Sequence, residues 1–201
     1  MAINLANNNS LANITALPSS ISGGAMTLLA TQTASGSANL SFTSGIDDTY
    51  DSYVFKFYNM HPATDSVPLK FNMSTDSGSN YNVTKTTTFF RAYHNESDSA
   101  AALGYDTGAD LAQSTSFQEL SAYIGNGADE NCSGTLTLFS PSSTTFVKHF
   151  MSITNGVEDR DYSWNSYIAG YGNTTSAVDA IRFQFSSGNI DSGVIKLYGV
   201  S

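Results

Sequence analysis

The sequence predicts an all-β protein, specifically a single jelly-roll-like antiparallel β-sandwich with an extended N-terminal arm. The first observation is composition, because only 12% of the 201 residues are charged, about half the usual share. Ser, Thr, Asn and Gly replace the Lys and Glu that cover exposed helix faces, and Thr, Tyr and Phe suit pleated sheets. The second is the alternation of apolar and polar residues in short runs, and the third is the turn residues between those runs. Each strand then buries one apolar face, so two sheets must cover each other.

Residues 1–22 differ from the rest of the chain, and we expect them to form the arm, with the sandwich domain spanning 23–201. The segment is rich in Asn, lacks strand alternation and is closed by Pro18 and a pair of glycines. One interpretation is a disordered tail. The other is an arm that binds a partner subunit, because a tail that contacts only water needs no spaced aliphatic residues. The predicted partner-binding residues are Ile3, Leu5, Leu11, Ile14 and Leu17.

In the first half of the domain, short runs predict five strands. Residues 53–58 alternate in side-chain character with a period of two, and residues 69–73 repeat that period. Ala34–Ser37 and Asp76–Asn80 contain the Gly and Ser typical of turns. We therefore expect strands at 26–32, 38–43, 53–58, 69–73 and 85–94.

The second half begins with residues 95–110, where small residues mix with acids and glycine, and we expect a long surface loop there. Residues 117–124 fit a short strand better than a short helix, and residues 125–131 have the Gly, Asn and acids of a turn. Five further runs with strand composition follow, for a total of about ten strands, as in sandwiches and barrels. They lie at 134–139, 145–154, 162–171, 180–185 and 193–200.

The charge balance excludes several kinds of partner. Eight Lys and Arg against 17 Asp and Glu give a net charge of −9, so neither nucleic acid nor an anionic membrane surface is an expected partner. No apolar run is long enough for a transmembrane helix, and residues 1–9 lack the regions of a secretory signal. Cys132 is the single cysteine, so intramolecular disulfides are impossible, and we expect a small buried thiol.

Candidate metal ligands are few. His61, His94 and His149 occur without the His-Glu-x-x-His or Cys-x-x-Cys spacing of a zinc site, and His149 is expected to lie on an ordinary strand face. Acidic residues gather in three predicted turns, where solvated carboxylates are the expected state. Calcium is the alternative, because clustered loop oxygens suit a hard cation, but no EF-hand loop is present. We therefore expect no metal and no cofactor. The acidic groups are at 47–51, 129–130 and 158–161.

Motifs for nucleophilic catalysis and phosphate binding are also missing from the sequence. It has no Gly-x-Ser-x-Gly elbow, and Cys132 has no neighbouring base, so we expect a protein that is not an enzyme. Trp164 and Tyr167 are the remaining candidates, as glycan-contact residues, because aromatic faces beside Asn can stack on sugars. The same alternation is typical of a strand that packs into the core, which is the interpretation we favour for these aromatic residues.

One set of segments extends over nearly the whole chain and includes FTSGIDDTY at 42–50 and GNIDSGVIKLYG at 188–199. The others are at 53–55, 59–62, 85–95, 110–117 and 138–150. These segments resemble a family of short structural proteins encoded by marine tailed bacteriophages. The resemblance implies a head-decoration or fibre-like protein of the virion, located on the capsid surface or tail after assembly in the host cytoplasm. It also implies a homo-oligomer, with a trimer favoured by analogy, and it provides no catalytic residues.

Two classes of function follow from these expectations. The first is a capsid decoration (cement) protein that binds the major capsid protein, or another virion protein, through its arm. The alternative is a tail-fibre or receptor-binding module that recognises host surface glycans, in which Trp164 and Tyr167 would be exposed and clustered. A polysaccharide-cleaving enzyme is a third and weaker alternative, because it needs two carboxylates that face each other across a cleft.

Overall fold

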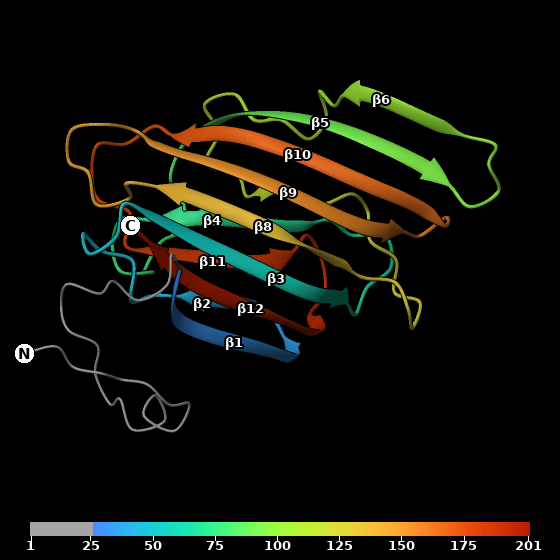
Figure 1. The fold of residues 1–201 in the computed structure, drawn as a ribbon, viewed down its shortest axis with the longest axis horizontal. Coiled ribbons are helices and arrows are strands. Elements are labelled where there is room, and N and C mark those ends of the chain that lie inside the picture. Colours follow the sequence, from blue (N-terminus) through green and yellow to red (C-terminus); the bar gives the residue numbers. More distant parts are fainter. Residues whose placement is uncertain (1–25) are drawn as a thin grey trace, which may run out of the picture.

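The computed structural model describes residues 26–201, which form two antiparallel β-sheets packed as a sandwich (Figure 1). No helix occurs among these residues. The predicted all-β sandwich is thereby confirmed, whereas the jelly-roll connectivity stays a prediction. The predicted arm, with its five partner-binding aliphatic residues, lies outside the described residues.

The larger sheet has eight strands in the spatial order β1-β12-β3-β8-β9-β10-β5-β6, and the smaller has four in the order β2-β11-β4-β7. β1 and β6 are therefore the two edges of the larger sheet. Its strands are β1 (Thr27–Ser37), β3 (Ser52–Pro62), β5 (Lys85–Asn95), β6 (Ala101–Tyr105), β8 (Cys132–Phe139), β9 (Lys148–Glu158), β10 (Tyr162–Gly172) and β12 (Ile190–Val200). The smaller sheet contains β2 (Leu40–Phe42), β4 (Leu69–Ser74), β7 (Gln118–Glu119) and β11 (Ala180–Phe185).

The core lies between the two sheets and is centred on Phe183 of β11. The Phe183 ring centroid lies 5.4 Å from that of Phe55 and 6.3 Å from that of Phe42. Phe71 meets Phe150 edge-on at 5.0 Å between centroids, so both sheets contribute rings to one cluster. Full burial of a Phe side chain stabilises the fold by about 1.5–3 kcal/mol. Because alternate residues of each strand point into this core, the residues between them point outward.

Three expectations about secondary structure are corrected. Ala34–Ser37 was expected to be a turn but belongs to β1, because Ala34 and Ser35 pair with Gly193 and Ser192 of β12. Residues 101–105 were expected to lie in a loop but form the edge strand β6, paired with β5. The strand expected at 145–154 begins at Lys148 and continues to Glu158, where it stays paired with β10. Pairing with a neighbouring strand overrides local composition in all three cases.

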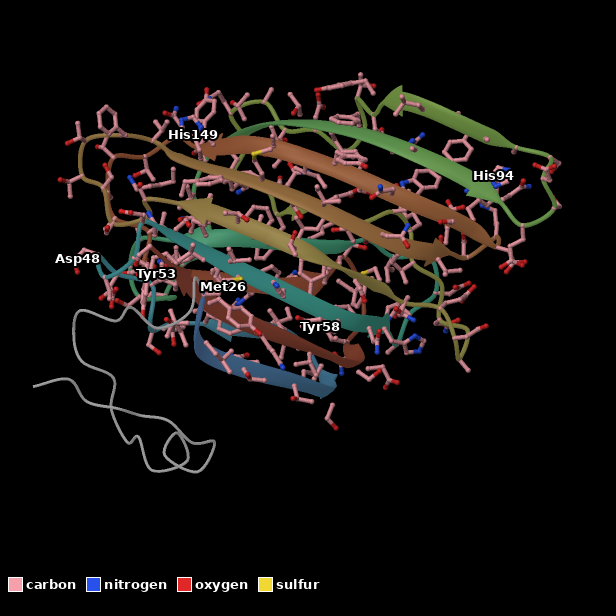
Figure 2. The ribbon with its side chains drawn as sticks, in the orientation of Figure 1. Met26, Asp48, Tyr53, Tyr58, His94 and His149 are labelled. Atoms are coloured by element: carbon pink, nitrogen blue, oxygen red, sulfur yellow. The ribbon has the colours of Figure 1, made fainter. Side chains whose placement is uncertain are left out.

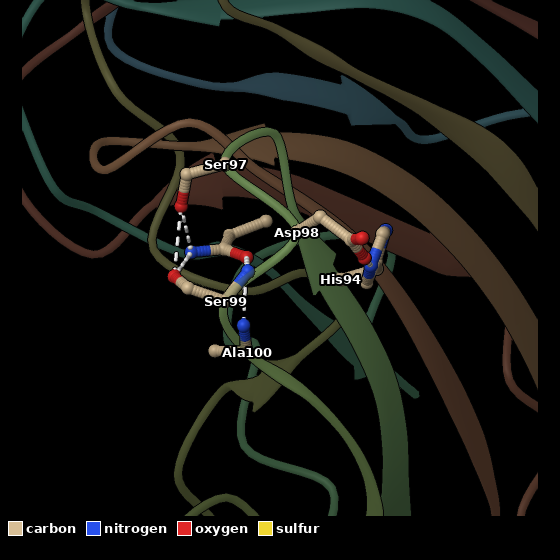
Figure 3. A network of polar contacts seen from close by, with 6 residues as sticks. His94, Ser97, Asp98, Ser99 and Ala100 are labelled. Carbon is tan, nitrogen blue, oxygen red and sulfur yellow. Dashed lines mark hydrogen bonds and ion pairs between the residues drawn. The ribbon is translucent and has the colours of Figure 1, made fainter.

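The turn between β5 and β6 is organised by the side chain of Asn95, whose partners Ser97, Ser99 and Ala100 are labelled in Figure 3. Asn95 Oδ1 accepts hydrogen bonds from the backbone N–H of Ser99 at 2.9 Å and of Ala100 at 2.8 Å. Its Nδ2 donates to the hydroxyls of Ser97 and Ser99, both at 2.8 Å. An Asn side chain that satisfies backbone groups in this way fixes a turn. This network therefore holds β6 against β5 at the far end of the sheet.

Two lysines are buried beneath loops without a carboxylate partner. Lys85 Nζ donates to Asn72 Oδ1 at 2.6 Å and to the Val83 carbonyl at 2.7 Å. Lys148 Nζ donates to the carbonyls of Ser143 and Phe146, both at 2.6 Å. Burial lowers the pKa of both ammonium groups, to about 7 for Lys85, because desolvation disfavours the charged form.

Candidate functional site: the apolar outer face

The surface of the larger sheet that points away from the core is almost free of carboxylates. The eight strands contain only two acidic residues, Glu158 at the end of β9 and Asp191 near the start of β12, although the chain has 17. Glu158 is only 1% exposed, so it adds no accessible charge to this surface. In a protein of net charge −9, such a surface differs from the rest of the molecule. Depletion of charge together with aromatic enrichment is typical of the centre of a protein interface.

We define the apolar outer face by the outward-pointing side chains of β8, β9, β10, β5 and β6. One transverse row of this face consists of apolar residues that are cross-strand partners of one another. The rings of Phe90 and Tyr167 stack with centroids 4.9 Å apart and planes at 5°. Ile153 and Tyr105, on either side of this pair, are 50% and 54% exposed. Soluble proteins rarely expose contiguous apolar rows of this kind to water, so such a row usually marks a site that binds another molecule. The row is Tyr105, Phe90, Tyr167 and Ile153.

Beside this row the face is hollowed into a groove of about 480 Å³ at one end of the strands. Side chains of β5, β8, β9 and β10 line it, and a smaller hollow of about 220 Å³ adjoins it through the shared residues Phe139 and Met151. No acidic residue lines either hollow. The main lining side chains are Thr86, Thr88, Phe139, His149, Met151 and Tyr171. Figure 2 shows His149 toward the same end of the sandwich as Met26 and Tyr53, with His94 at the opposite end.

Positive charge lies in line with the apolar row on β3 and β12, which β8 separates from the row. Lys56 of β3 and Lys196 of β12 are direct cross-strand partners. Each ammonium lies over a tyrosine ring, Lys56 at 5.6 Å from the centroid of Tyr198 and Lys196 at 5.9 Å from that of Tyr58. These cation–π contacts keep the lysine stems along the sheet. The outer surface of the sheet thus combines an apolar half with a weakly basic half.

Trp164 and Tyr167, the candidate glycan-contact residues, lie on opposite faces of β10. Trp164 points inward, is 6% exposed, and stacks on Tyr93 with ring centroids 4.9 Å apart. The guanidinium of Arg91 covers the Trp164 ring at 4.6 Å. Tyr167 points outward against Phe90. The structure therefore does not bring the two residues together into one aromatic platform. Trp164 is buried, as the core-packing interpretation expects, whereas Tyr167 points outward, contrary to that interpretation.

The three histidines lie in separate environments. His61 Nδ1 donates to the Glu130 carbonyl at 2.6 Å, and His94 Nε2 lies 3.0 Å from Asp98 Oδ1 in an exposed pair (Figure 3). His149 lines the groove on the outer face. Within residues 26–201, no three His, Cys, Asp or Glu side chains are placed to hold a metal ion.

The acidic turn residues are not all solvated, contrary to expectation. Glu158 is buried at the end of β9, and its Oε1 accepts a hydrogen bond from exposed Arg160. Asp47 is exposed, but a hydrogen bond from the backbone N–H of Thr49 lowers its pKa, with a further contribution from the Tyr53 hydroxyl. These two carboxylates therefore have structural roles in closing a strand and a turn.

Cys132 is buried at the start of β8, as predicted. Burial raises the pKa of its thiol to about 12, because desolvation disfavours the thiolate. The thiolate is the nucleophilic form of cysteine, so this side chain is unreactive at neutral pH.

Comparisons with known proteins place the chain in no established group: no family model, curated protein or solved structure matches it. Across residues 26–201, no helix is long and apolar enough to cross a membrane.

The apolar outer face was not expected from the sequence, although the sequence contains a signal for it. A strand with one solvated face alternates apolar with polar residues, whereas Phe89 and Phe90 are consecutive, as are Phe150 and Met151. Consecutive large apolar residues in a predicted strand indicate that both of its faces are apolar. Which of these residues lie beside each other depends on the strand order, which the sequence does not determine.

Proposed function

We propose that this protein is a non-enzymatic structural protein of a bacteriophage virion, a capsid decoration (cement) protein that binds the head lattice as a homo-oligomer. The observation that carries the proposal is the apolar outer face, which offers an interface without the charges that cover the remaining surface. The resemblance of the sequence to short virion proteins supports the same class. The proposed copy number in the oligomer is three, and the proposed partners are other copies of the chain and the major capsid protein.

The energetics of the face suit reversible addition to a lattice. Phe90, Tyr105 and Ile153 of the row are roughly half exposed, so complete burial of each contributes on the order of 1 kcal/mol. A single contact is then weak, because association also costs translational and side-chain freedom. Many copies on one particle turn weak contacts into firm attachment, since each bound neighbour makes the next association more favourable.

Electrostatics add specificity to the proposed contact. A net charge of −9 keeps free copies apart in solution. The apolar face lacks this repulsion, and Lys56 and Lys196 beside it attract an acidic surface. Association is therefore directed to this side of the sandwich rather than to any other.

A matched pair of substitutions tests the face as the interface. Ile153→Glu places a carboxylate at one end of the apolar row, and Tyr123→Glu, at a residue of similar exposure (48%) outside the face, is the control. Sedimentation of the purified proteins should show that Ile153→Glu weakens self-association while Tyr123→Glu matches the parent protein. Equal association of all three proteins would contradict the proposed interface.

The virion location is tested separately, with antibodies raised against the purified protein and particles of a tailed phage whose genome carries this sequence. Labelling distributed over the head supports decoration. Labelling confined to the tail supports the alternative, a receptor-binding module for host glycans, for which Tyr167 beside the Asn165 amide provides an aromatic and hydrogen-bonding surface. Unlabelled particles would contradict a structural role in the virion.

A further inference from the structure

The groove on the outer face lies on the same transverse row of the sheet as the start of β1. Successive strand pairings connect Leu28 on β1 to Thr88 on β5 through one outward-facing residue on each strand between them. None of these residues is charged, so an uncharged track runs from the root of the N-terminal segment to the groove. The track consists of Leu28, Tyr198, Val54, Thr137, Met151, Ala169 and Thr88.

The segment that precedes β1 matches this track in chemistry. The first charged side chain of the sequence is Asp47, so residues 1–46 contain none, in a chain that is 12% charged overall. Leu11, Ile14 and Leu17 recur at every third residue within it. An uncharged aliphatic segment can be buried on an uncharged face without desolvating an ion on either side. Burial of the same segment on a carboxylate-lined surface elsewhere on the molecule would desolvate charged groups.

The length of the segment also matches the distance to the groove. Five strand spacings separate β1 from β10, or about 24 Å at about 4.8 Å each. Leu17 lies ten residues before Thr27, and those ten steps along the chain span up to about 33 Å when extended. Residues 18–26, which contain a proline and two glycines, are therefore long enough to cross the sheet and to place the aliphatic residues at the groove.

We infer that residues 11–17 bind in the groove of their own chain, with Leu11, Ile14 and Leu17 as the inserted side chains. Binding within one chain is favoured over exchange between dilute copies, because a linker of this length gives a millimolar effective concentration. The row from Tyr105 to Ile153 lies outside the groove, although Ile153 lines the smaller hollow beside it, and the row stays available for the proposed virion partner. The groove thus binds the N-terminal segment, and the apolar row binds the virion partner.

Disulfide trapping in the full-length chain tests the inference. Ile14→Cys is combined with Met151→Cys, whose position lines the groove, and the protein is oxidised. Native Cys132 is buried and does not compete. We expect a disulfide within one chain, seen as faster migration on a non-reducing gel and as a linked peptide pair. The control combines Ile14→Cys with Tyr123→Cys, away from the groove, and should form the bond much more slowly. Equal rates in the two variants, or a disulfide-linked dimer, would overturn the inference.

A second measurement avoids introduced cysteines. Met151 is exposed in the groove, so a bound segment should slow its oxidation by hydrogen peroxide. Replacing Leu11, Ile14 and Leu17 together by Ser keeps the segment at full length and should accelerate Met151 oxidation several-fold, as measured by mass spectrometry. Unchanged oxidation would overturn the inference. Either failure leaves the sedimentation test of Ile153 intact, because that residue lies outside the groove.

Discussion

Buried Lys85 provides a stability prediction whose sign and size follow from its surroundings. Its side chain is fully buried, and its Nζ contacts only the Asn72 amide oxygen and the Val83 carbonyl. Burial lowers the pKa of Lys85 from 10.5 to about 7. Between these two values the folded state holds a neutral amine while the unfolded state binds a proton. The free energy of unfolding therefore rises with pH through this window, and the penalty of the buried charge is fully present below pH 7.

The expected magnitude is on the order of 5 kcal/mol across the whole window, at about 1.4 kcal/mol for each pKa unit. Lys85→Met removes this titration. It also leaves two acceptors without a donor, at a cost of about 1–3 kcal/mol each, but that cost does not depend on pH. The difference in unfolding free energy between the parent and Lys85→Met should therefore grow in favour of the parent from pH 7 to pH 10.

Denaturant unfolding followed by Trp164 fluorescence measures this difference at several pH values. All other ionisable groups are the same in the two proteins, so their contributions cancel in the difference. Lys70→Met is the matched control, because Lys70 is only partly buried and pairs with Glu119 at 3.0 Å. Parallel stability curves for the parent and Lys85→Met would refute the account of a buried, unpaired ammonium group.

Two further predictions concern the ends of the larger sheet and β10. Asn95→Ala should destabilise the β5–β6 turn by about 1–3 kcal/mol, because two backbone N–H groups lose their acceptor. Hydrogen exchange of the β6 amides should accelerate while the core amides stay protected. Uniform acceleration of all amides would contradict a local role for Asn95. Trp164→Ala should cost about 3–5 kcal/mol of unfolding free energy, whereas Tyr167→Ala on the opposite face should cost much less. Equal losses in thermal unfolding would show that the two residues share one environment.

The sandwich could be predicted from the sequence because alternation and turn chemistry are local signals. Residues 180–185 form β11 with the expected bounds, because alternation and flanking Gly and Ser agree there. Residues 101–105 were missed because Ala, Leu and Gly have no strong strand preference, and β6 exists only through its pairing with β5. The turn expected at Ala34–Ser37 is wrong because the pairing of β1 with β12 continues past Gly36, whose φ is 60°.

The candidate site was less predictable than the fold. Trp164 and Tyr167 are three residues apart, and period-two geometry alone places them on opposite faces of a strand. The apolar row depends on four different strands, and their order is set by long-range pairing that no local pattern reveals. The sequence could show that Phe90 and Met151 break a simple alternation, but not that they lie on the same face.

Hydroxyl-radical footprinting tests most directly whether the apolar outer face is buried when the protein is bound to the virion. The free protein is compared with the protein bound in phage particles, and the modification of individual side chains is measured by mass spectrometry. We expect strong protection of Tyr105, Phe90, Tyr167 and Ile153 on the particle, with Tyr123 modified as in the free protein. Unchanged modification of these four residues on the particle, with protection elsewhere, would contradict it.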